Sequence, residues 1–108
     1  MSTVKIGGAR ILLSSWEVTA FVSKDGPAAE DLRRAVVARV MVTAAMESAK
    51  ETGNATSLER AMNTARLEVT RLQECVDVAK RAKDTEAAVN LGISTKRLLS
   101  ALDEAEKL

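Results

Sequence analysis

The sequence has 108 residues, of which 46% are hydrophobic and 29% charged, and its 16 basic and 15 acidic side chains leave a net charge of +1. This composition excludes a disordered chain. The lack of histidine, together with a single cysteine, excludes histidine-based catalysis, Cys–His zinc sites and a disulfide scaffold. We therefore expect one domain over residues 1–108, with no enzymatic activity, no catalytic residue, no metal and no cofactor. The longest apolar runs fall far short of the ~20 residues of a membrane span, and no secretory leader opens the chain, so we expect a cytoplasmic protein with no membrane partner.

The first 24 residues are compatible with a helix or with a hairpin. A helix over residues 9–24 would place one set of mostly apolar residues on one face, namely Ile11, Ser15, Val18 and Val22. As a strand, the segment from Trp16 to Ser23 would alternate between two faces, and residues 4–6 before Gly7-Gly8 would form the other arm of a hairpin. We prefer the helix, because three further helices of similar length need a fourth to complete a bundle.

The next helix is predicted over residues 27–52. Pro27 suits a first helical turn because its missing N–H would lack a partner there. Glu30 and Asp31 complement the positive end of the helix dipole. Gly53 and Asn54 are typical of a helix end.

Apolar side chains cover about 200° of this second helix, whereas a bundle helix needs a stripe of just over ~100°. Either the helix is central in its own domain, or its second face meets another subunit. Because the two following helices are one-sided, we favour oligomerisation. The residues expected at the oligomer interface are Val37, Val40, Met41 and Ala44.

Caps and periodicity predict the last two helices. Thr56 and Glu59 form a predicted capping box, with Thr56 as the cap. The helix that follows carries an apolar stripe with spacings of four and three: Leu58, Met62, Ala65, Val69, Leu72, Val76 and Ala79. A second stripe is out of phase with the first: Ala88, Leu91, Thr95, Leu98, Leu102 and Ala105. The change of phase predicts a helix boundary at residues 83–85, with Asp84 or Thr85 as cap, and leaves Gly92 inside the last helix.

Basic residues are expected to gather at one end of the molecule. An antiparallel pairing of the second and third helices brings five of them to that end, as candidates for binding a nucleic-acid backbone: Arg33, Arg34, Lys80, Arg81 and Lys83. Acidic residues at the same end make a solvated, locally paired surface the alternative. Gly7-Gly8-Ala9-Arg10 lacks the remaining residues of a phosphate loop, and Cys75 is expected to be a small core residue.

Loose helical motifs run from Leu32 to the C-terminus: Leu32-Arg33-Arg34-Ala35, Ala45-Met46-Glu47, Leu58-x-x-Ala61-x-x-x-Ala65-x-x-Glu68-x-x-x-Leu72 and Leu98-Leu99-x-x-Leu102-Asp103-Glu104. This pattern resembles a family of small bacterial four-helix-bundle proteins. The family comprises the accessory variability determinants of diversity-generating retroelements and the proteins encoded in intervening sequences of ribosomal RNA genes. The resemblance implies a ring, typically a homopentamer, and for the retroelement members it implies binding of nucleic acid and of a reverse transcriptase. Arg33 and Arg34 match the family's basic pair.

We therefore predict an all-α, antiparallel up-and-down four-helix bundle that forms a homo-oligomer and acts as a non-catalytic binding or accessory protein. Its predicted partners are further copies of itself, the backbone of RNA or DNA, and a reverse transcriptase or another protein. Two alternatives remain open. One is a small helical subunit of a nucleoprotein complex, and the other is an adaptor or scaffold that binds protein without nucleic acid.

Overall fold

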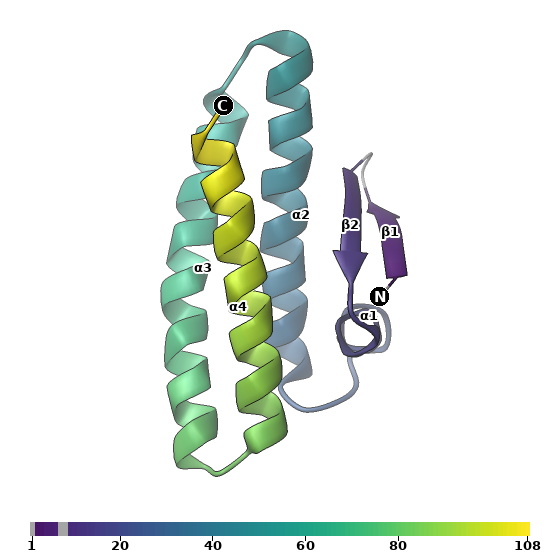
Figure 1. The fold of residues 1–108 in the computed structure, drawn as a ribbon, viewed down its shortest axis with the longest axis vertical. Helices are drawn as coiled ribbons and strands as arrows, with labels where there is room; N and C mark the ends of the chain where they lie inside the picture. The colour runs from purple at the N-terminus through teal and green to yellow at the C-terminus, as the bar shows by residue number, and fades with distance from the viewer. Residues whose placement is uncertain (1, 7–8) are drawn as a thin grey trace.

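Three long helices and a short N-terminal unit make up the protein, shown by a computed structural model that describes residues 2–6 and 9–108 (Figure 1). In chain order the elements are β1 (Ser2–Ile6), β2 (Ala9–Leu13), α1 (Ser15–Ser23), α2 (Ala29–Thr52), α3 (Thr56–Arg81) and α4 (Thr85–Glu106). Figure 1 shows α2, α3 and α4 side by side, each antiparallel to the one before it, with the hairpin and α1 beside α2. The chain is thus mostly helical, with a small two-stranded sheet. Among the described residues, no helix is both long and apolar enough to cross a membrane.

Residues 9–13 form a strand, so our preference for a helix over all of residues 9–24 is wrong at its start. β1 and β2 pair antiparallel with Val4 opposite Ile11, so residues 4–6 do belong to the other arm of a hairpin. Gly7-Gly8 lies outside the described residues. Alternate residues of β2 are buried beside Val36 of α2: Ala9, Ile11 and Leu13. Burial of this face against a helix stabilises a hairpin that would be marginal in isolation.

Helix α1 begins at Ser15, so the strand alternation that starts at Trp16 is also incorrect. The local signal for the helix is Glu17, whose Oε1 accepts the backbone N–H of Ser14 at 2.9 Å. This bond satisfies an N–H group at the helix start that has no partner within the helix. Because α1 is only 9 residues long, it does not extend along the full length of its neighbours.

The ends of the long helices follow local signals with two exceptions. The first is the start of α2, which begins at Ala29 after Ala28 in the left-handed conformation, so Pro27 lies before the helix and not in its first turn. Gly53 ends α2 in the left-handed conformation, with a φ of 73° and its N–H bonded to the Ala49 carbonyl. Asp84 caps α4 by accepting the Ala87 N–H at 3.2 Å, which confirms the predicted boundary. The predicted capping box is wrong, because Thr56 is the first residue of α3 and its N–H is satisfied by the side chain of Asn54 at 3.0 Å.

Helix α2 is central, because it packs against α3, α4, α1 and β2. One face enters the main core with α3 and α4 through residues such as Ala35, Ala38 and Val42. Another face contributes Val36 to a second cluster beneath the hairpin, with Val40 and Ala44 at its edge. The hairpin therefore covers, within one chain, part of the apolar surface that the helical projection assigns to another subunit.

Candidate functional site

A groove between α3 and α4 has a volume of 780 Å³. Its floor is apolar and consists of Val76, Ala88, Val89, Gly92 and Ile93. Val89 is 52% exposed and Ile93 is 36% exposed, although both are large and hydrophobic. Within α4, the groove residues recur at spacings of three and four and form a second stripe beside the one that faces the core. This spacing is typical of a helix face that packs against another helix.

Lysines form the rim of this groove. Lys80 comes from the end of α3, Lys83 from the turn and Lys96 from α4, and none of the described acidic residues lines the groove. In the part of the chain that the structure describes, none of the three lysines forms a salt bridge with a carboxylate. The rim therefore carries positive charge that the chain itself does not neutralise.

Two residues that line the groove, Gly92 and Lys83, lower the stability of the fold by their backbone conformation. Glycine inside a helix costs about 1 kcal/mol relative to alanine, and a Cβ at Gly92 would meet no atom of the described residues within 4 Å, apart from the nearby backbone of its own helix. Lys83 has a φ of 58°, a left-handed conformation that costs a residue with a side chain about 1 kcal/mol or more. Alanine at 92 and glycine at 83 would fit the isolated chain better.

The five basic residues predicted to bind nucleic acid do not form one patch. Lys80 and Lys83 line the groove, but Arg34 pairs with Glu68 of α3 at 3.1 Å and Arg33 lies 5.7 Å from the centre of the Phe21 ring. At about 1.5 Å per residue, the α3 axis advances about 18 Å from Glu68 to Lys80. Arg81 is exposed near the end of α3. The arginine pair of α2 and the lysines of the turn therefore occupy separate places on the surface.

The four residues predicted at an oligomer interface also divide into two pairs. Val37 and Met41 are exposed, whereas Val40 and Ala44 are partly buried against the cluster beneath the hairpin. The apolar surface left for another subunit on α2 is therefore smaller than the helical projection indicates. A role for Val37 and Met41 in oligomerisation stays a prediction.

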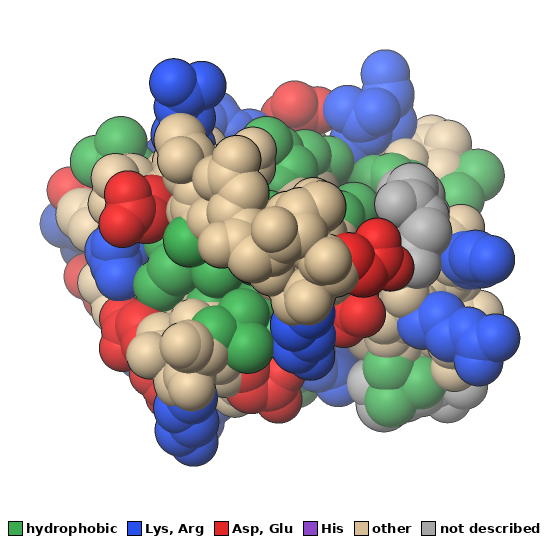
Figure 2. Space-filling view, turned by 90° about the horizontal axis from the view of Figure 1, so that it is seen from above, with side chains coloured by type: hydrophobic (Ala, Val, Ile, Leu, Met, Phe, Trp, Pro, Cys, Tyr) green, Lys and Arg blue, Asp and Glu red, His purple; other side chains and the backbone are tan. Residues whose placement is uncertain are grey.

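The end of the molecule that carries the α2–α3 turn shows charge of both signs. Viewed from that end, both basic and acidic side chains are exposed, and several basic side chains follow one another on the right-hand side of the view (Figure 2). This mixture agrees with the net charge of +1. Of the lysines that line the α3–α4 groove, Lys80 and Lys83 lie at the opposite end of α3, beside the α3–α4 turn, and Lys96 lies further along α4.

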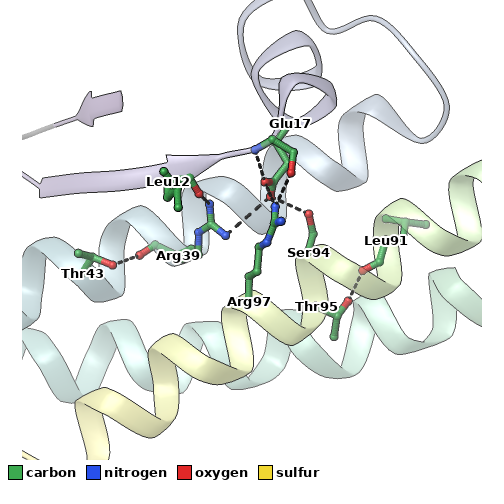
Figure 3. Close-up of polar contacts among 9 residues, drawn as sticks. Leu12, Glu17, Arg39, Thr43, Leu91, Ser94, Thr95 and Arg97 are labelled. Carbon is green, nitrogen blue, oxygen red and sulfur yellow. Dashed lines mark hydrogen bonds and ion pairs between the residues drawn. The ribbon is translucent and has the colours of Figure 1, made fainter. Parts of the chain in front are cut away.

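A buried carboxylate joins the N-terminal unit to the long helices (Figure 3). Glu17 is only 1% exposed and accepts the hydroxyl of Ser94 at 2.9 Å, in addition to the Ser14 N–H. Arg97 of α4 donates to the same carboxylate and to the Ser14 hydroxyl. Arg39 of α2 lies 3.8 Å from it and donates to the Leu12 carbonyl at 2.8 Å. We call Ser14, Glu17, Arg39, Ser94 and Arg97 the Glu17 cluster.

The Glu17 cluster borders an open cavity of 450 Å³ that is also lined by Arg10 and Glu104. Burial lowers the pKa of Arg39, although the nearby Glu17 carboxylate partly opposes this effect. Arg39 and Arg97 are both engaged with groups of the N-terminal unit. The cluster therefore explains how the hairpin and α1 are held on α2 and α4.

A second ionic group links α2 to α3. Arg71 donates to Asp31 at 2.6 Å and lies 2.5 Å from Glu68. Burial acts to lower the pKa of Arg71, but hydrogen bonds and charges from the two carboxylates raise it above its ordinary value. Cys75 lies one turn further along, half-buried against the core, and burial together with the Asp31 charge raises the pKa of its thiol. A raised pKa means less thiolate, which fits a packing role for Cys75.

Comparisons with protein-family models, with curated proteins and with solved structures found no match. The resemblance drawn from helical motifs therefore stays a prediction. The described residues contain no group of three or more side chains suited to hold a metal ion.

Sequence reasoning missed the α3–α4 groove, although part of its signal was present. Val89, Gly92, Ile93 and Lys96 follow one another at spacings of three, one and three on the face of α4 beside the core stripe. That face contains one glycine and one lysine, so it lacks the continuous apolar character of a core stripe. Only the position of Val76 and Lys80 on the neighbouring helix turns this face into a groove.

Proposed function

We propose that this chain is a non-catalytic protein-binding module whose α3–α4 groove receives a helix of a partner protein. The observation that carries the proposal is the open space above Gly92, between exposed Val89 and Ile93, in a groove that the chain does not fill. Small residues allow close approach of a second helix, and large exposed apolar side chains beside them gain free energy when covered.

The arrangement of the helices supports the same role. In the described chain, α1 is short and lies on α2, so the groove between α3 and α4 has no helix of its own chain over it. A helix laid in the groove would pack on α3 and α4 and complete a four-helix bundle from two chains. The bundle that we predicted within one chain would thus be formed on binding.

The nucleic-acid alternative has less support from the described contacts. It needs Arg33 and Arg34 available to phosphates, but Arg34 pairs with Glu68 and Arg33 lies against Phe21. Phosphate contacts also make no use of an apolar floor such as Val89 and Ile93. The adaptor alternative also binds a protein, and the groove between α3 and α4 offers it an apolar surface in place of the second helix.

The test is a titration of the isotope-labelled chain with an uncharged amphipathic helical peptide of about 20 residues, followed by NMR amide shifts. We expect shifts confined to residues that line the groove, and loss of binding in the variant Val89→Glu. Leu67→Glu is the matched control, because Leu67 is 75% exposed on α3 and does not line the groove. Shifts centred on Val37 and Met41, or an equal loss of binding in both variants, would overturn the proposal.

A further inference from the structure

We infer that the helix bound by the α3–α4 groove is acidic and amphipathic, with an apolar stripe flanked by carboxylates that meet Lys80, Lys83 and Lys96. This inference rests on the proposed function and adds the chemistry of the partner. The floor of the groove requires apolar side chains from the partner, and its rim requires negative charge. Complementary charge around an apolar contact favours the correct partner and speeds its association.

The charge of the rim is suited to a partner because it is not used within the chain. The acidic residues next to the α3–α4 turn in the sequence, Asp77, Asp84 and Glu86, do not line the groove. Asp84 is occupied as the cap of α4, where it accepts the Ala87 N–H. An incoming carboxylate would therefore meet lysines without competing against a salt bridge already present.

The lysines also specify how the partner's charges are spaced. Lys80 and Lys83 lie at the turn end of the groove, and Lys96 lies at the other end. From Thr85 to Lys96 the α4 axis advances about 16 Å, at about 1.5 Å per residue. A helix lying along the groove would therefore carry its carboxylates about three turns apart. Between them, Gly92 leaves room for contact with the partner, because a Cβ added there would meet no side chain of the described residues within 4 Å.

A second copy of this chain is a poor occupant. In a symmetric dimer formed by this groove, each subunit presents the same residues. The lysines of the two copies, at residues 80, 83 and 96, would then face one another, and like charges at an interface are repulsive.

The test compares three helical peptides of about 20 residues that share one apolar stripe and differ only in the flanking residues. These residues are Glu, Gln or Lys, placed about three turns apart. We expect the full chain to bind the Glu peptide roughly 10-fold more tightly than the Gln peptide and to bind the Lys peptide least. The preference should shrink at about 0.5 M salt, because exposed charges are then screened.

The variants decide whether the lysines cause the preference. Together, Lys80→Glu, Lys83→Glu and Lys96→Glu should reverse the order, so that the Lys peptide binds most tightly. A control with the same change in net charge carries Lys5→Glu, Arg60→Glu and Lys107→Glu, which lie outside the groove, and should keep the original order. If the control variant abolishes the preference for the Glu peptide as fully as the groove variant does, the inference is overturned.

The remaining outcomes separate this inference from the proposed function. If the Glu and Gln peptides bind equally and Val89→Glu abolishes the binding of both, the groove binds a helix but the acidic partner is overturned. No binding of any of the peptides would overturn both. Light scattering of the chain alone gives a further check: a dimer that Val89→Glu converts to a monomer would identify a second copy as the occupant and overturn the acidic partner.

Discussion

Neutralising Glu17 should destabilise the protein more than any single change on its surface. The variant Glu17→Gln keeps the size of the side chain but removes the charge that faces Arg97 and Arg39. Glu17 is 1% exposed, and the side chain of Arg39 is 9% exposed. Arg39 would therefore remain buried without a counterion, and such a charge is costly because water cannot solvate it.

The expected magnitude follows from the exposure of each partner. Removing one member of a buried ion pair costs about 3–5 kcal/mol. Arg97 contributes less than a fully buried partner would, because 27% of its side chain is exposed and water screens part of its charge. We therefore expect a loss of about 3 kcal/mol, a large part of the ~5–15 kcal/mol that stabilises a typical domain.

Urea unfolding followed by circular dichroism measures this loss. Glu74→Gln is the matched control, since Glu74 is exposed on α3 and the change should alter the free energy of unfolding by less than about 0.5 kcal/mol. Hydrogen exchange in Glu17→Gln should show protection lost first in β2 and α1, because the cluster joins these elements to α2 and α4. A destabilisation below about 1 kcal/mol, or loss of protection in α3 before β2, would refute the proposed importance of the buried charge.

Local geometry also predicts the effects of changes at Gly92, Lys83, Cys75 and the exposed face of α2. Gly92→Ala should raise the free energy of unfolding by about 1 kcal/mol, measured in urea, because no atom of the chain opposes the added Cβ; a loss of stability would show that the space is needed within the chain. Lys83→Gly should stabilise by about 1 kcal/mol, because its φ of 58° suits glycine, and unchanged stability would contradict this account. Alkylation of Cys75 at pH 8, followed by mass spectrometry, should be slower in the folded chain than in urea, because burial raises the pKa of the folded thiol. The unfolded thiol ionises first, so Cys75 should also make folding less favourable as the pH rises past the ordinary thiol pKa. Finally, Val37→Glu with Met41→Glu should leave helical circular dichroism intact, since both side chains are exposed; a fall in mass by light scattering would confirm the predicted oligomer interface.

Local sequence signals were enough to predict the long helices and most of their ends. The alternating stripe from Leu58 to Ala79 is buried as expected, apart from a partly exposed Val76, and Gly92 lies inside α4. Gly53 and Asp84 act at the helix ends through bonds to residues three or four positions away. Such features are predictable because the groups that interact are neighbours in the sequence.

The N-terminal unit shows where local signals were insufficient. The alternation of residues 9–13 is short, and the same residues also fit one face of a helix. What selects the strand is the surface offered by Val36, Val40 and Ala44 of α2, which the hairpin covers. Once the hairpin lies there, the wide apolar surface of α2 no longer requires another subunit across its whole width.

Only the tertiary structure decided the position of the charges and of the groove. Glu17 meets Ser94 and Arg97 at sequence separations of 77 and 80 residues, so no local pattern connects them. In the same way, Lys80 and Lys96 border one groove only because the turn at Lys83 brings α3 and α4 side by side. The physical reason is common to both cases. Periodicity and capping depend on bonds along one helix, whereas ion pairs and grooves depend on the distance between helices, which packing of the whole chain determines.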